Sequence, residues 1–164
     1  MKTAEYRTVD KSEWARGPWD DEPDKMQFPD EATGLPCLIV RGPMGALCGY
    51  VGVAEGHPAF GVDYSDVRIA GEDGEREYVD VHGGLTFADH CQLHQAGEAR
   101  GIRHVPSEGE PDHVWWLGFD CAHAWDVMPA HSMHLDFFRD AVYRDVAFVR
   151  RECQRLAQQL AGMH

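Results

Sequence analysis

The strongest constraint on the fold is an amphipathic segment near the end of the chain. Between residues 139 and 161 the apolar side chains recur at spacings of four and three, at Val142, Val146, Val149, Cys153, Leu156 and Leu160. This period places them on one side of an α-helix, with arginines and glutamines on the other side. Gly162 follows as a helix terminator. Because such a helix is stable only against a second apolar layer, the rest of the chain must supply that layer.

Three apolar segments, rich in β-branched and aromatic residues, can form this layer. Residues 35–41 and 46–53 flank the turn sequence GPMG, which predicts a hairpin. Residues 114–120, VWWLGFD, are apolar on both faces until Asp120, which predicts an interior strand. Both faces of the sheet should therefore be covered near its middle.

A short helix is predicted over residues 87–96, because Thr86 and Asp89 have the spacing of a capping box. The 17 glycines and nine prolines imply many turns and little other long helix. We therefore predict an α+β fold: a mostly antiparallel sheet, a long C-terminal amphipathic helix and one or two short helices.

The first 34 residues are expected to differ from the rest. Pro18, Pro23 and Pro29 oppose both a regular helix and a central strand. We predict an irregular N-terminal arm over residues 1–34, packed on a single α+β domain at 35–164. The length of 164 residues fits one compact unit.

The net charge of the chain limits the kinds of molecule that it can bind. The chain carries 28 acidic and 15 basic side chains, a formal net charge of −13. This balance argues against binding to nucleic acid or to anionic membranes, since both need clustered Lys and Arg. No apolar run approaches the roughly 20 residues of a transmembrane helix, and the N-terminus lacks an apolar signal core. Five widely spaced cysteines without a CxxC pair are expected to be reduced thiols, so we predict a cytoplasmic protein.

Ionisable residues gather where two predicted strands end. His82 closes the segment EREYVDVH, and Asp120, His123 and Asp126 follow VWWLGFD at intervals of three. If the two strand ends meet, His82, Asp120 and His123 can bind zinc, manganese or iron through two nitrogens and an oxygen. Asp126 would complete the coordination sphere or act as a base with His123. A bound water would become nucleophilic near neutral pH.

The turn after His82 is the candidate substrate site. Gly83 and Gly84 permit positive φ and close approach of a ligand to the backbone. With Thr86, they precede the predicted short helix, whose N-terminal N–H groups suit a substrate oxygen.

Three other interpretations of these residues remain open. Without metal, Asp120 and His123 could form an acid/base pair. His82 and the 120–126 turn could instead be a hydrogen-bond network that joins two strand ends. Cys121 could be a nucleophile beside a base, although its apolar neighbours favour a buried thiol.

Several motifs in a fixed order resemble those of a family of small proteins encoded by bacteriophages, prophages and some bacteria. They are LCGYVGVAEGHPAFG, DVHGGLTFADHC, WWLGFDCAHAWD and YRDVAFVRRECQRLAQQL, and they span most of the chain from Trp19 onward. The resemblance implies a phage-type accessory protein acting in the bacterial cytoplasm, and it brings no established catalytic residues. The residues themselves favour a divalent-metal-dependent hydrolase of a small or phosphorylated substrate. The alternative is a non-catalytic binding module that sequesters a nucleotide or blocks a host protein.

Overall fold

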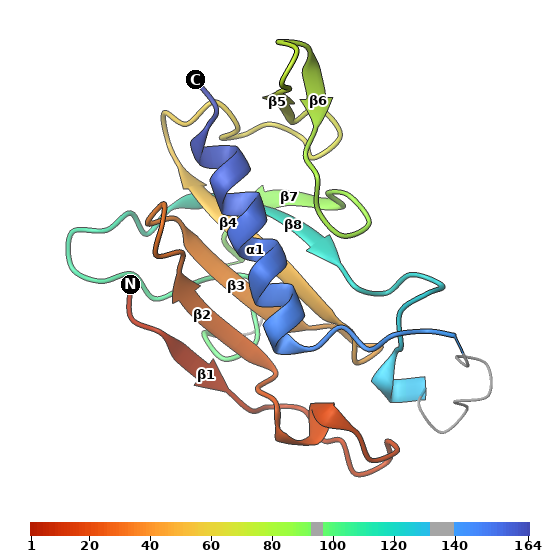
Figure 1. The fold of residues 1–164 in the computed structure, drawn as a ribbon. Coiled ribbons are helices and arrows are strands. Elements are labelled where there is room, and N and C mark those ends of the chain that lie inside the picture. The colour runs from red at the N-terminus through yellow and green to blue at the C-terminus, as the bar shows by residue number, and fades with distance from the viewer. Residues whose placement is uncertain (93–96, 132–139) are drawn as a thin grey trace.

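The computed structural model describes residues 1–92, 97–131 and 140–164, and it contains one large antiparallel sheet crossed by a single long helix (Figure 1). The six strands of the sheet, in spatial order, are β1 (Ala4–Tyr6), β2 (Lys25–Pro29), β3 (Pro36–Arg41), β4 (Leu47–Ala54), β8 (Val114–Asp120) and β7 (Phe87–His90). A separate hairpin pairs β5 (Arg68–Ala70) with β6 (Arg76–Tyr78). The helix α1 spans Val146–Ala161, and the described residues also contain two short 3₁₀ turns, η1 (Pro18–Asp21) and residues 129–131. The predicted α+β fold is confirmed.

The predicted hairpin is β3–β4, and its position explains why both faces are apolar. It lies in the middle of the sheet, with β4 paired to β8 from Cys48–Asp120 to Ala54–Val114. Helix α1 crosses one face and buries its apolar stripe there, including Val149, Cys153, Leu156 and Leu160 at 0% exposure. The other face holds a second cluster that includes Leu38 and Trp116.

The second face is covered by the segment that leads to β8. Ile102 packs against Leu38 and Trp116. The segment is fastened by Lys25, whose side chain is only 1% exposed. Its ammonium donates hydrogen bonds to the carbonyl oxygens of Glu98, Gly101 and Arg103 at 2.5, 2.6 and 2.8 Å.

The prediction of an irregular arm over residues 1–34 is wrong for two segments. β1 and β2 extend the same sheet, with β2 between β1 and β3. The prolines do not prevent this, because Pro18 and Pro23 lie outside the strands and Pro29 is the last residue of β2. Trp19 and Phe28 are buried, at 4% and 0% exposure, so they do anchor this part of the chain.

The predicted short helix is also wrong, because residues 87–90 form strand β7. The Thr86 N–H donates to the Gly118 carbonyl, and Ala88 pairs with Leu117 of β8. Pairing with an interior strand therefore outweighs the local capping signal, and residues 93–96 lie outside the described residues.

The long helix begins later than the apolar spacing indicates. Asp145 caps it by accepting a hydrogen bond from the Phe148 N–H at 2.8 Å. Val142, expected on the apolar stripe, instead forms an isolated bridge with Asp126 and is 52% exposed. Gly162 ends the helix as predicted. None of the helices in the described ranges combines the length and apolarity needed to cross a bilayer.

Candidate metal centre

Three potential metal ligands meet beyond the end of β8. One ligand atom each from His82, His123 and Asp126 lies within 4.8 Å of the other two. His82 Nε2 and His123 Nδ1 are each 2.9 Å from the same oxygen, Oδ2 of Asp126. The expectation that His82 meets the 120–126 turn is confirmed, although His82 precedes a turn into β7 and does not itself end a sheet strand.

His82 is held in place by helix α1. Its backbone N–H donates to Glu152 Oε2 at 2.9 Å, and its ring packs edge-on against Phe148 at 5.2 Å between centroids. Asp80, two residues before His82, is bonded at both its N–H and its carbonyl by the Gln159 side chain of the helix, each at 2.8 Å. The helix therefore fixes both the backbone and the ring orientation of this candidate ligand.

His123 is fixed by the turn that contains it. The Asp126 N–H donates to the His123 carbonyl at 2.9 Å, which brings residues i and i+3 together. The His123 ring stacks on Trp125, with centroids 4.9 Å apart and planes 4° from parallel. Trp125 is itself 53% exposed, so the pair lies at the surface.

Asp126 is the carboxylate at the centre of the cluster and is fully buried. It accepts hydrogen bonds from His82, from the ring and backbone N–H of His123, and from Arg144 Nε at 2.9 Å. Burial raises the pKa of this carboxyl, but the hydrogen bonds from His82, Arg144 and His123 outweigh burial and hold the pKa below its ordinary value. Asp126, which the sequence offered as a base, is therefore a buried carboxylate whose oxygens already accept hydrogen bonds from His82, His123 and Arg144.

Asp120 lies beside the cluster and is not part of it. Its Oδ1 accepts from the Ala122 N–H at 3.0 Å and lies 3.9 Å from His123 Nε2. Its Oδ2 accepts from the Thr86 hydroxyl at 2.9 Å. With 32% of its side chain exposed, Asp120 is the carboxylate that faces solvent.

The glycine turn serves the cluster in a different way from the one predicted. Gly83 and Gly84 have φ of +68° and +79°. A Cβ on Gly83 would lie 2.3 Å from His123 Nε2, so only glycine leaves room for that ring. Since a strand follows this turn, no helix N-terminus is present to bind an anion. The Gly84 N–H donates to the Val81 carbonyl at 2.8 Å.

Cys121 is a buried thiol, at 1% exposure. Burial and the nearby Asp126 carboxylate raise its pKa, which disfavours the thiolate that a nucleophile requires. All five cysteines are free.

Two residues that bond the cluster were not predicted from the sequence. Arg144 is one of the arginines expected on the polar side of the helix, yet it precedes α1 and donates to Asp126 Oδ1. Nothing in its local sequence indicates this contact. Glu152, which bonds His82 and is 7% exposed, could have been found, because it is a carboxylate adjacent to the apolar helix residues Val149 and Cys153.

No family model, no curated protein and no solved structure matches this chain. Function must therefore be inferred from the geometry of the site.

Proposed function

We propose that His82, His123 and Asp126 bind a divalent metal ion, with zinc, manganese or iron as candidates, and that the protein is a metal-dependent hydrolase of a small or phosphorylated substrate. The observation that carries this proposal is the meeting of two imidazole nitrogens and one carboxylate oxygen from segments 41 residues apart in the chain. Three protein ligands with a fourth position free for water is the usual composition of a catalytic zinc site.

The two nitrogen-to-oxygen distances support the proposal, and the two ring nitrogens lie within 4.8 Å of each other. Ligand atoms about 2.0–2.1 Å from a tetrahedral metal are about 3.3 Å apart. The two N···O distances of 2.9 Å therefore need to open by only a few tenths of an ångström. Metal binding would replace the ring protons now donated to Asp126, and Arg144 would remain on the other carboxylate oxygen as a supporting contact.

The sequence places Asp120 among the expected metal ligands and Asp126 as a further ligand or a base. The burial of the two side chains favours Asp126 as the ligand and Asp120 as the base. Asp126, enclosed by four donors, suits a ligand. Asp120, partly exposed and 3.9 Å from the His123 ring, suits the general base. A metal ion there would lower the pKa of its bound water, and Asp120 would accept the proton of that water.

The turn retains one donor for a substrate oxygen. The Gly83 N–H is free among the described residues, whereas Thr86 uses both its N–H and its hydroxyl within the protein. In this proposal Gly83 binds substrate, Thr86 positions Asp120, and Gly84 shapes the turn.

The resemblance to phage-encoded proteins and the five free cysteines support a setting in the reducing bacterial cytoplasm. We propose this setting for the hydrolase, with the substrate taken from the small-molecule pool of the host.

Metal content tests the proposal. Untagged protein, purified without chelator and then given equimolar zinc, manganese or iron(II), is desalted and analysed by plasma mass spectrometry. We expect near-stoichiometric retention of a metal by the wild type and by His90→Ala, which removes an exposed histidine outside the cluster. We expect its loss in His82→Ala and His123→Ala.

The variants also separate the proposal from its strongest competitor. Asp126 is already satisfied by hydrogen bonds without a metal, which favours a purely structural network as the second candidate. That network predicts no retained metal in any protein and a lower melting temperature for His123→Ala. If metal is retained, hydrolysis of p-nitrophenyl phosphate and p-nitrophenyl acetate should fall in Asp120→Asn while metal content stays unchanged.

A further inference from the structure

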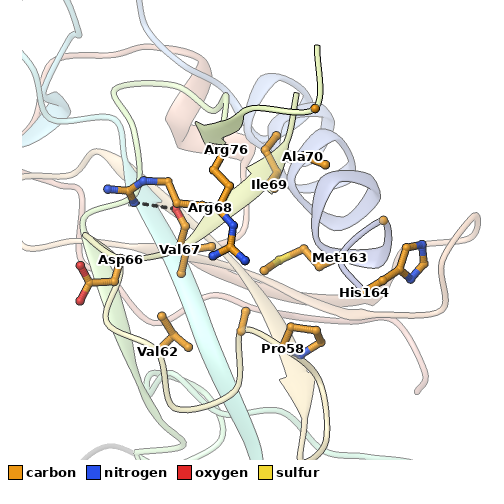
Figure 2. Close-up of a pocket in the computed structure, with 13 residues that line it drawn as sticks. Pro58, Val62, Asp66, Val67, Arg68, Ile69, Ala70, Arg76, Met163 and His164 are labelled. Atoms are coloured by element: carbon orange, nitrogen blue, oxygen red, sulfur yellow. Dashed lines mark hydrogen bonds between the residues drawn. The ribbon is translucent and has the colours of Figure 1, made fainter. Parts of the chain in front are cut away.

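A cavity of about 460 Å³ lies away from the metal centre and shares no residue with it (Figure 2). Three parts of the chain enclose it: the β5–β6 hairpin, residues 58–62, and residues 162–164 after helix α1. Its size lies within the range of about 300–1,000 Å³ that holds small organic ligands.

The apolar wall of the cavity is tied to the core of the protein. Ala59 and Val67 are 0% and 2% exposed. The Val62 carbonyl accepts a hydrogen bond from Trp115 Nε1 of β8 at 3.0 Å. A wall fixed in this way is preformed, so a ligand need not order it on binding.

His57 joins this wall to helix α1. Its Nε2 lies 2.9 Å from the Leu160 carbonyl, and its Nδ1 accepts from the Ala59 N–H at 3.0 Å. Because Nδ1 accepts, Nε2 must donate, and the ring holds residues 57–59 against the last turn of the helix. Two of the three lining segments, residues 58–62 and 162–164, are therefore fixed relative to each other.

Arg76 supplies the positive charge in the cavity. Figure 2 shows its guanidinium pointing into the middle of the space, while the Asp66 carboxylate points away. Arg68, the other arginine of the lining, is already occupied: it donates to the carbonyls of Ser65 and Val67, and it lies 3.6 Å from the centre of the Tyr78 ring. Among the described residues the side chain of Arg76 has no hydrogen-bond or ion-pair partner.

A guanidinium beside an apolar wall recognises a carboxylate or phosphate that carries an apolar body. The charge of the protein selects between the two. With a net charge of −13 and the acidic turn GEDGE between the hairpin strands, a dianion is repelled more strongly than a monoanion. We propose that this cavity binds a small organic monocarboxylate, with the carboxylate on Arg76 and the apolar body against Val62, Val67 and Met163.

The test uses hexanoate, which joins one carboxylate to a short apolar chain. Protein labelled with ¹³C in the methionine methyl groups is titrated, and the Met163 signal is assigned from Met163→Leu. We expect a saturable shift of this signal with hexanoate, and at least about tenfold weaker responses to acetate and to hexanamide, which lack the apolar body and the charge respectively. Arg76→Gln should weaken hexanoate binding about tenfold or more and leave hexanamide binding unchanged.

Arg16→Gln is the matched control, because the Arg16 side chain is 97% exposed on another part of the chain. Equal affinities for hexanoate and hexanamide, or equal hexanoate affinity in Arg76→Gln and wild type, would overturn the proposal. So would a Met163 signal that does not move with hexanoate. Hexyl phosphate is offered in parallel, and tighter binding of this dianion would overturn the choice of a monocarboxylate.

Discussion

The buried ammonium of Lys25 gives the sharpest prediction about this fold. Three backbone carbonyls accept hydrogen bonds from this ammonium. Burial has the larger effect on its pKa, and together with the nearby charge of Arg103 it lowers the pKa of Lys25 from 10.5 to about 8. The carbonyls of Glu98, Gly101 and Arg103 thus hold a cation that the interior disfavours.

The effect on stability follows from proton linkage. Between pH 8 and pH 10.5 the unfolded chain keeps its proton on Lys25 while the folded protein releases it. Stability contributed by this group therefore rises with pH across that window and is constant below it. The full difference is about 3 kcal/mol, and about 2 kcal/mol of it falls between about pH 7.5 and about pH 9.5.

Two assays measure this effect. The chain has only three lysines, so ¹³Cε signals of labelled lysine resolve Lys25 directly, with its signal assigned by loss in Lys25→Arg. Its titration midpoint should lie near pH 8. Urea unfolding of the wild type and of Lys25→Met should show the wild type gaining about 2 kcal/mol relative to the variant from about pH 7.5 to about pH 9.5.

The comparison with Lys25→Met removes a confounding effect. Burial raises the pKa of Cys37, Cys121 and Cys153, so these thiols lower the stability of both proteins as pH rises, and they cancel in the difference. A Lys25 midpoint at or above 10.5, with a flat stability difference, would refute the reasoning. It would mean that the three carbonyls compensate fully for the loss of water.

Other predictions concern packing, charge and capping. Gly49→Ala should destabilise the protein by about 1–3 kcal/mol, since its Cβ would lie 2.4 Å from Phe119 Cζ and 2.8 Å from Cys153 Sγ; urea unfolding measures this. Asp24→Asn should cost about 3–5 kcal/mol, because it removes the carboxylate that bonds the fully buried guanidinium of Arg41 at 2.8 Å and leaves it with the more distant Glu22 carboxylate at 3.9 Å; a compensating Arg41→Met should recover part of this loss. Asp145→Ala removes the cap of α1 and should lower stability by about 1 kcal/mol, which a thermal melt would detect.

The parts of the fold that were predictable share one property, which is apolar patterning over many residues. The β3–β4 hairpin, strand β8 and the stripe of α1 each need burial along their whole length, so few arrangements satisfy them. β2 was not predictable in the same way. Lys25 and Gln27 are polar, yet they are buried at 1% and 3% exposure because distant backbone groups accept their hydrogen bonds.

Strand β7 shows how a local signal can mislead. A capping box stabilises a helix only if the following residues have no better partner, and here the exposed edge of β8 provides one. The hydroxyl of Thr86 is consequently free to bond Asp120 instead of capping a helix. A single error in secondary structure therefore changed the expected chemistry of the turn, from an anion site on a helix to a contact that orients a carboxylate.

Asp120 and Asp126 show where reasoning from sequence reaches its limit at the site. Both are aspartates three residues from His123, and the spacing alone gives them equal claims to bind a metal. The fold separates them: the 123–126 turn directs Asp126 inward to Arg144 and His82, while Asp120 remains partly exposed to solvent, beside Thr86. Arg144 is decisive because a buried carboxylate needs a compensating cation, and this one lies 18 residues further along the chain. The candidate residues could thus be named from the sequence, but the proposed division into ligand and base depends on burial that only the assembled structure defines.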